Sequence, residues 1–373
     1  MPELHFKGKE FVYNHHLTVP YRPLIIQPKK SLGDNLENMI IHGDNLHALK
    51  ALMPRYAGKV DCIYIDPPYN TGEQSWSYND NVNSPVMQQW LKENPVNSDD
   101  MLRHDKWSCL MYPRLNLLSQ LLREGGVIFV SINDMEVNNL RYMMTDLFGE
   151  DQFIAQFVWK SRLNKDNRNT TGVSIDHEYI VCYGKRVKGD ERKVEQYSNP
   201  DNDIRGDWAS GNMVGMASKE ARKNLHYDLI NPETAINYGC PDQGWRYEPS
   251  RMQNMITEKR ILWPAVATGR PREKVFLNEL EGEPNISSII GAGLYTKDGT
   301  EELEAIFGTR PFELLRARSI LLHLAYHMAI CRAEKCLRGY ACRIGLLFMK
   351  NGKVSANFKQ RSVSSERCYF PLG

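Results

Sequence analysis

Short apolar runs alternate with stretches of helical periodicity through the first half of this 373-residue chain. Leu46, Leu49 and Leu52 recur at helical spacing, as do six apolar residues between Trp107 and Leu122. Strands that alternate with helices predict an α/β fold with a mostly parallel sheet, and unbroken apolar runs predict strands buried on both faces. The predicted strands are 39–42, 62–65, 127–132, 153–159 and 177–183.

Polar and glycine residues predict where these elements begin and end. Asn45 is a plausible N-cap of the first helix, and Ser98 would begin the helix that carries Trp107. Pro113 predicts a kink in that helix, and Gly125-Gly126 predicts its end. Residues 1–35 show no sustained period, so we expect an irregular arm with short strands around Phe11–Tyr13.

The stretch Val60–Gly72 combines a buried strand with a rigid polar turn. Asp66 follows the apolar run, and Pro67 and Pro68 remove two backbone donors, which favours free backbone carbonyls at this point. Tyr69 adds an aromatic ring. A carboxylate, carbonyl oxygens and a flat ring suit a planar ligand with an exocyclic amine, such as a nucleobase taken out of a duplex. The alternative is an ordinary turn after a strand.

The sequence Asp66-Pro67-Pro68-Tyr69-Asn70-Thr71-Gly72 resembles the catalytic motif of amino-group DNA methyltransferases. With Asn-Thr-Gly after it, the motif is similar to that of N6-adenine enzymes, including the modification subunits of type III restriction-modification systems. The similarity covers about residues 36–313 and includes Gly43-Asp44-Asn45 and the segment Gly125–Asp134. The resemblance implies a Rossmann-like methyltransferase fold, S-adenosylmethionine as methyl donor and a flipped adenine of double-stranded DNA as substrate.

The resemblance also implies roles for single residues. Asp66 and the Pro67 carbonyl would accept hydrogen bonds from the adenine amine within the Asp66-Pro67-Pro68-Tyr69 motif, and Tyr69 would stack on the base. The residues matching Gly43 and Asp44 would lie by the adenine of the methyl donor.

Two further positions, Asn45 and Asn133, belong to the expected cofactor site. For Asp44 the alternative is a helix cap and nothing more. For Asn133 and its neighbour Asp134, a cap on the following helix is the more ordinary role.

A basic loop follows the predicted strand 153–159. Its short polar side chains and its Lys and Arg residues suit contacts to phosphates and base edges, although a solvated loop is an equal alternative. The candidate DNA-binding residues are Lys160, Arg162, Lys165 and Arg168. A second loop, 73–97, carries Trp76, Tyr78 and Trp90, which we expect to pin the loop rather than stack on bases.

The domain organisation follows from these shifts in pattern. We expect an N-terminal arm at 1–35, a catalytic core at 36–183, and a polar, aromatic-containing insertion at 184–264, where the family carries its target-recognition region. Residues 265–313 would return to the core, and 314–373 form an atypical tail.

The tail departs from the family. Between Arg310 and Gly373 there are twelve Lys or Arg residues and three Asp or Glu residues. The family's donor turn, Asp-x-x-Ala-Gly-Ser-Gly, is missing, although Gly339–Gly345 can be encoded so that the next reading frame gives it. A truncated or frameshifted C-terminus is therefore expected. It leaves a second function open, that of a catalytically inactive DNA-binding remnant without the methyl-donor cradle.

Composition narrows the remaining classes. No C-x-x-C pair occurs, and His177-Glu178 lacks a second histidine four residues on, so no metal site is expected. The longest apolar stretch, 320–331, is too short to cross a bilayer. We expect a cytoplasmic protein with reduced thiols that acts on DNA, with a restriction (helicase-nuclease) subunit and a second copy of the chain as candidate partners.

Overall fold

The structure is a computed structural model. It describes residues 4–28, 43–71, 102–167, 170–187, 192–290 and 295–298, single positions between and after these ranges, and the backbone of 343–350 and 353–360. The chain divides into two compact units. The first comprises residues 1–189 and 286–373, and the second residues 190–285.

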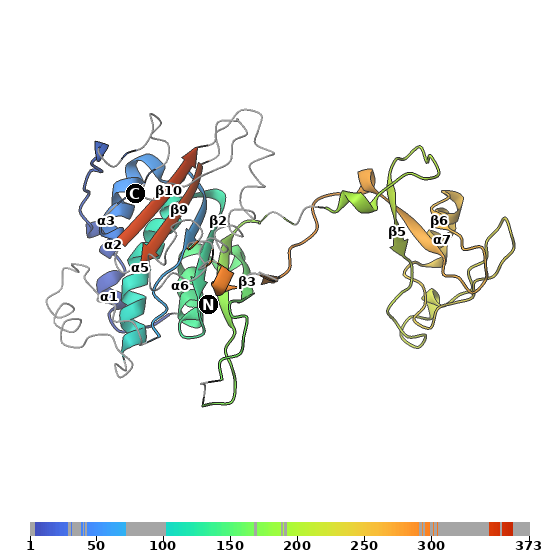
Figure 1. The fold of residues 1–373 in the computed structure, drawn as a ribbon, viewed down its shortest axis with the longest axis horizontal. Coiled ribbons are helices and arrows are strands. Elements are labelled where there is room, and N and C mark those ends of the chain that lie inside the picture. The colour runs from blue at the N-terminus through green and yellow to red at the C-terminus, as the bar shows by residue number, and fades with distance from the viewer. Residues whose placement is uncertain are drawn as a thin grey trace. The chain divides into compact units, whose positions relative to one another are not determined.

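A five-stranded sheet forms the centre of the first unit (Figure 1). Its order is β1-β2-β4-β3-β8. The bounds of these strands are β1 Val60–Ile65, β2 Leu122–Ile132, β3 Phe153–Lys160, β4 His177–Gly184 and β8 Ile289–Ile290.

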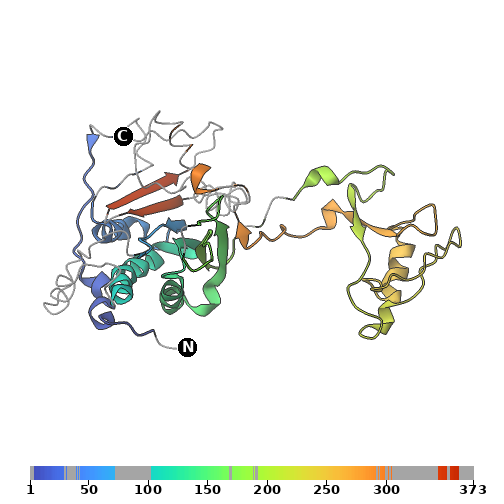
Figure 2. The ribbon, with the colours of Figure 1, turned by 60° about the horizontal axis from the view of Figure 1, so that its bottom comes forward.

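Four of the five strands run in one direction. β1 pairs in parallel with β2, and β3 pairs in parallel with β8, whereas β4 is antiparallel to both β2 and β3. Strand β4 is thus the single reversed strand of the described sheet. The predicted α/β class and mostly parallel sheet are confirmed, with helices along one face of the sheet (Figure 2).

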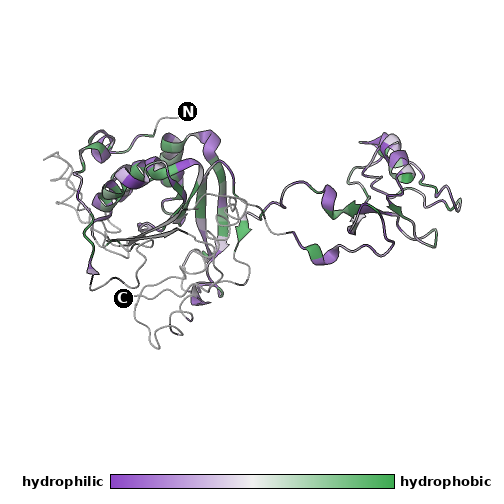
Figure 3. Ribbon diagram, turned by 90° about the horizontal axis from the view of Figure 1, so that it is seen from above, coloured by the Kyte–Doolittle hydropathy of each residue, from purple (hydrophilic) through white to green (hydrophobic). Residues whose placement is uncertain are grey.

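Alternate side chains of the strands point to opposite faces, and both faces are buried. Ile63 and Ile65 belong to the core beneath the helices, while Cys62 and Tyr64 are also at most 1% exposed on the other face. The strands carry hydrophobic (green) segments in Figure 3, as expected for strands without a solvent-facing side.

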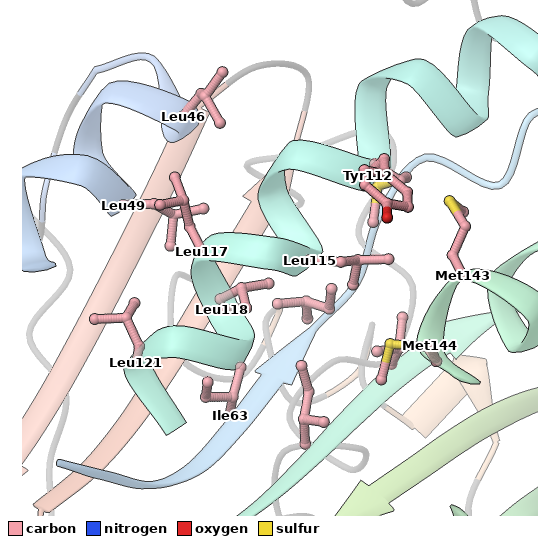
Figure 4. Close-up of a cluster of buried hydrophobic side chains, with 14 of the residues drawn as sticks. Leu46, Leu49, Ile63, Tyr112, Leu115, Leu117, Leu118, Leu121, Met143 and Met144 are labelled. Carbon is pink, nitrogen blue, oxygen red and sulfur yellow. The ribbon is translucent and has the colours of Figure 1, made fainter. Parts of the chain in front are cut away.

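Three helices close the first face: α3 Asn45–Tyr56, α5 Arg103–Leu121 and α6 Val137–Phe148. In Figure 4, α3 contributes Leu46 and Leu49, α5 contributes leucines such as Leu118, and α6 contributes Met143 and Met144 to one cluster. The spacing of the leucines therefore reports the buried stripe of each helix, as predicted.

Two predicted boundaries were wrong. Asp44, not Asn45, caps α3, because the Asp44 carboxylate accepts a hydrogen bond from the His47 N–H at 3.1 Å. Helix α5 ends at Leu121, and Gly125-Gly126 lies inside β2. The register between β1 and β2 shifts there, and Gly125 has a φ of 72°, so the glycines form an irregularity in the strand rather than a helix stop.

The N-terminal arm contains short helices instead of the expected strands. They are α1 Lys9–Val12 and α2 His15–Thr18. Val12 is fully buried in the core of the first unit, and the Lys7 N–H donates to the Asp105 carboxylate of α5 at 3.0 Å. The arm is therefore packed against the domain along part of its length.

The second unit has its own sheet and core. Strands β5 Trp208–Asn212, β7 Arg272–Phe276 and β6 Ile261–Leu262 pair antiparallel in that order, and α7 Pro249–Thr257 accompanies them. Because β7 pairs with β5, residues 265–285 belong to this unit. The predicted return to the core at 265 was therefore placed too early.

Several predicted features lie outside the described residues. These are residues 40 and 42 of the strand at 39–42, the loop 73–97, the start of the helix at Ser98, Arg168, and most of the tail 314–373. Within the tail, β9 Arg343–Lys350 and β10 Lys353–Gln360 pair antiparallel. None of the helices in the described ranges is long and apolar enough to cross a membrane.

The contact between the end of β4 and β2 gives a test of the sheet. Gly184 has a φ of 143°, and a Cβ there would overlap the Gly126 carbonyl oxygen and lie 2.9 Å from Val127 Cα. Gly172 also has a positive φ, 77°, but no atom within 4 Å. Urea denaturation should show a loss of about 1 kcal/mol for Gly172→Ala and a further loss of about 1–3 kcal/mol for Gly184→Ala. Equal losses would contradict this strand pairing.

Candidate active site

One edge of the sheet collects most of the residues predicted to be functional. Because β1, β2 and β3 run in the same direction, their carboxyl ends lie at one edge, together with the first residues of the reversed strand β4. Ile65 pairs with Val130, Ile132 pairs with Tyr179, and Lys160 pairs with His177. The turn after β1 therefore lies at the edge where α/β sheets bind their ligands.

The turn itself is anchored by a tryptophan of α5. The Trp107 indole N–H donates to the Pro68 carbonyl oxygen at 2.6 Å, and Trp107 is fully buried. The Pro67 carbonyl accepts no hydrogen bond from the described part of the chain. Asp66, half-buried, begins the turn. The carbonyls predicted to be unused are those of Asp66 and Pro67, and the Trp107 contact falls on Pro68, which that prediction does not include.

Asn70 fixes the far end of the turn. Its φ of 57° is in the left-handed region, and its side chain is buried. The side-chain amide donates to the Glu136 carboxylate and, at 3.2 Å, to the Arg103 carbonyl oxygen. Asn70 therefore connects the turn to α5 and to the residue that precedes α6.

Tyr69 reaches across to β4. Its hydroxyl donates to Glu178 Oε2 at 3.2 Å, and its ring packs against the hydrophobic core of the first unit. The backbone on either side of Tyr69 is held by Trp107 and Asn70, as described above. The ring is consequently held at its base and at its hydroxyl.

Glu136 is a fully buried carboxylate. Besides Asn70, the Asn139 amide donates to it at 2.8 Å, and His104 Nδ1 lies 2.6 Å from Oε1. Burial raises the pKa of Glu136, while the hydrogen bonds from Asn70 and Asn139 and the proximity of His104 oppose that rise. Such a group costs free energy to ionise and contributes most to stability when protonated.

The residues expected to bind the cofactor differ in whether their side chains can contact a ligand. Asp44 is partly exposed at the start of α3, with Oδ1 engaged as the helix cap. Asn45 is buried, and its amide oxygen accepts from Arg114 Nε at 2.6 Å. Gly43 directly precedes the cap. A polar ligand could therefore meet the Asp44 carboxylate, whereas Asn45 serves packing between α3 and α5.

Asn133 and Asp134 follow β2 at the same edge as the turn. The Asn133 amide oxygen accepts from the Met135 N–H at 3.1 Å, and neither residue is the N-cap of α6. The Tyr179 hydroxyl donates to Asp134 Oδ1 at 2.8 Å, and burial together with this carboxylate raises the pKa of Tyr179 to about 12. The structure thus places Asn133 at the predicted edge but gives it a local turn contact.

The basic loop after β3 is only partly described. Arg162 donates to Asp166 at 2.8 Å and remains 48% exposed, while the Lys160 ammonium lies 5.9 Å from the centre of the Tyr295 ring. Lys165 is exposed. Two of the three described cations therefore already have partners in the protein, and their contact with DNA stays a prediction.

The sequence did not single out several residues that hold the turn. In the sequence Trp107 stands out only as part of an apolar stripe, and the pattern indicates no role for His104, Glu136, Asn139 or Glu178. An acid directly before a helix, as Glu136 is, usually indicates a favourable charge at the helix start. Its burial against Asn70 depends on a contact between residues 66 positions apart.

Comparison with known proteins agrees with this geometry. Residues 60–232 match the family model N6_N4_Mtase, described as DNA methylase, and the match begins at the first residue of β1. The matched residues include the Asp66–Tyr69 turn, β2, β3 and β4, and they extend into the second unit.

Relatives come from restriction-modification systems. The chain is 28% identical over 313 residues to the type III StyLTI Mod subunit of Salmonella typhimurium, covering 77% of this chain and 46% of the relative. It is 26% identical over 334 residues to the EcoP15I Mod subunit of Escherichia coli, covering 74% and 50%. The chain therefore spans about half the length of these relatives.

The chain matches a larger share of a type II enzyme than of these type III subunits. The methyltransferase M.KpnI of Klebsiella pneumoniae is 27% identical over 317 residues, which are 79% of this chain and 72% of the relative. Among solved structures, a putative DNA modification methylase from Thermus thermophilus is 14% identical with a TM-score of 0.26, covering 41% of this chain and 56% of its own. A likeness of that size does not bear on the fold.

The buried carboxylate predicts a pH dependence of stability. Because the pKa of Glu136 is raised above its ordinary value of 4.5, its contribution to the free energy of unfolding is greatest below pH 4.5 and declines as the pH rises through the raised pKa. Glu136→Gln lacks this titration. Urea denaturation between pH 4.5 and about pH 7 should show the variant gaining stability relative to wild type as the pH rises. A difference independent of pH would contradict the raised pKa.

Proposed function

We propose that this chain is a site-specific DNA methyltransferase that transfers a methyl group from S-adenosylmethionine to N6 of adenine. One observation carries the proposal: Asp66, Pro67 and Tyr69 stand in a turn fixed from three sides at the ligand-binding edge of the sheet. A turn that only linked two elements would not require a buried indole, a buried carboxylate and a strand carboxylate to hold it.

The turn would act by positioning and electrostatics. The amine of an extruded adenine donates to the Asp66 carboxylate and to the Pro67 carbonyl, whose oxygen has no partner in the described chain. These bonds would hold the nitrogen lone pair out of conjugation with the ring, so that it could bond to the methyl carbon while that carbon's bond to the donor sulfur breaks. The proton that N6 loses passes towards Asp66. Tyr69 stacks on the base and prevents its return to the duplex.

The methyl donor supplies a methyl group on a positively charged sulfur when it is bound. Of the predicted cofactor residues, Asp44 suits a role in binding, since its side chain is partly exposed and its second carboxylate oxygen can accept a hydrogen bond. Gly43 beside it leaves room for close approach. Asn45 does not suit this role, because it is buried against Arg114.

The matched family model covers both N6 and N4 amino groups by its name, so it does not choose between adenine and cytosine. Two other observations favour adenine as the base that is methylated. The residues Asn70-Thr71-Gly72 after the motif resemble those of the N6-adenine enzymes, and four type III Mod subunits, one of them described as probable, are among the relatives.

The partners also belong to the proposal. Double-stranded DNA would contact Lys160, Arg162, Lys165 and Arg168, and the second unit would read the recognition sequence, since it interrupts the catalytic unit where the family carries that region. Two of the relatives are Mod subunits of type III restriction-modification enzymes. A restriction subunit and a second copy of the chain are the further partners that we propose.

Removal of the Asp66 carboxylate tests the proposal. Purified wild-type chain, labelled methyl donor and unmethylated DNA should yield N6-methyladenine after hydrolysis of the DNA. Asp66→Ala should lower the rate roughly 10²–10³-fold, because one oriented acceptor in the site is lost. The matched control is Glu124→Ala, an exposed carboxylate at the start of β2, which should keep the wild-type rate. Transfer by Asp66→Ala at the wild-type rate would remove Asp66 from catalysis.

The same experiment separates the two functions left open by the sequence. A wild-type chain that binds DNA but neither binds the donor nor transfers a methyl group would be the DNA-binding remnant. If the DNA contained methylated cytosine instead of methylated adenine, the chain would still be a DNA methyltransferase, but the proposed target base would be wrong.

A further inference from the structure

We infer that Glu136 is a positioning residue that sets the geometry of the proposed catalytic turn through Asn70. The inference deepens the proposed function and rests on it for its catalytic consequence, but the contact itself can be tested without methyl transfer. Glu136 has no role in the resemblance stated above, and it contacts the residue that directly follows Tyr69.

The position of Asn70 makes this contact decisive for the turn. A left-handed φ of 57° is uncommon for a residue with a side chain, and asparagine adopts it more readily than most. The two prolines before Tyr69 supply no N–H groups, so backbone hydrogen bonds cannot fix this segment in the usual way. The Asn70 amide replaces them, since it donates to both Glu136 and the Arg103 carbonyl.

The burial of Glu136 indicates a structural role beyond a favourable charge at the start of α6. A fully buried carboxylate is costly unless several donors surround it. Its hydrogen-bond partners come from three different segments: Asn70 from the turn, His104 from α5 and Asn139 from α6. An acid that only favoured the start of α6 would do so at the surface. The observed arrangement instead joins the turn to both helices.

Glu136 and Glu178 fix Tyr69 at two different points. Glu178 accepts from the ring hydroxyl, while Glu136 fixes the backbone one residue later. Loss of Glu178 would free the end of the ring. Loss of Glu136 would free the backbone segment that carries both the Pro67 carbonyl and the Tyr69 ring. Methyl transfer should therefore be slowed more by the loss of Glu136 than by the loss of Glu178.

Hydrogen exchange measured by mass spectrometry tests the contact directly. In Glu136→Ala, the amides of Tyr69, Asn70 and Thr71 should exchange about tenfold faster or more, in line with the loss of a buried hydrogen bond. The amides of β1, at Cys62–Ile65, should be unaffected. Glu136→Gln keeps an acceptor for Asn70 and should stay close to wild type. The control Glu150→Ala removes an exposed acid after α6 and should change nothing.

A second variant guards against misfolding of Glu136→Ala. Asn70→Gly keeps the left-handed backbone but removes the amide, and it should raise exchange at Tyr69 and Thr71 in the same way. For transfer, both variants should lower kcat about 10–100-fold with little change in KM for DNA, and Glu136→Gln should recover most of the rate.

The outcomes separate the inference from the proposed function. Unchanged exchange at Tyr69–Thr71 in both variants, with wild-type kcat, would overturn the role of Glu136 and leave the methyltransferase proposal intact. If the wild-type chain transfers no methyl group, the proposed function fails, and the exchange measurements still decide whether Glu136 holds the turn.

Discussion

Two consecutive prolines impose the constraint on which this site depends. Pro67 and Pro68 give the turn after β1 a narrow range of backbone angles but remove the N–H groups that would tie it to its neighbours. The ties therefore come from side chains: the Trp107 indole at Pro68, the Asn70 amide at Glu136 and the Tyr69 hydroxyl at Glu178. Each of these contacts is made with a different part of the unit: α5, the residue before α6, and β4. The rigidity of the turn therefore depends on how firmly these three parts are packed.

The sheet explains how these elements meet. With β4 reversed between β2 and β3, its first residues lie at the edge where β1, β2 and β3 end. Glu178 is thereby brought within 3.2 Å of a tyrosine that is 109 positions away in the chain. Helices α5 and α6 pack on one face and bring His104 and Glu136 together behind the turn. The helical leucines and methionines of Figure 4 thus serve the site as well as the stability of the fold.

Local pattern was sufficient for strands β1 to β4, for helix α3 and for the central motif, and insufficient for the N-terminal arm and for the contacts around the motif. Apolar runs located β1 to β4 within a few residues, because buried strands on both faces leave a strong signal. Asp44 and Asn45 are both good caps, so local sequence left both open as the start of α3. Glu136 could not be found, since its burial results from a tertiary contact with Asn70 and not from its neighbours in sequence. The end of the insertion was misplaced because β7 pairs with β5, a strand that lies on the far side of α7 in the sequence.

The central claim is that the Asp66–Tyr69 turn receives the amine of an extruded base. A structure of the chain with a methyl-donor analogue and DNA, in which the modified adenine has first been located, tests it most directly. The account predicts that adenine N6 lies about 3 Å from the Asp66 carboxylate and from the Pro67 carbonyl oxygen, with the base plane against the Tyr69 ring. An adenine that remains stacked in the duplex, or that lies outside the turn while the DNA is bound at its recognition sequence, would contradict the account.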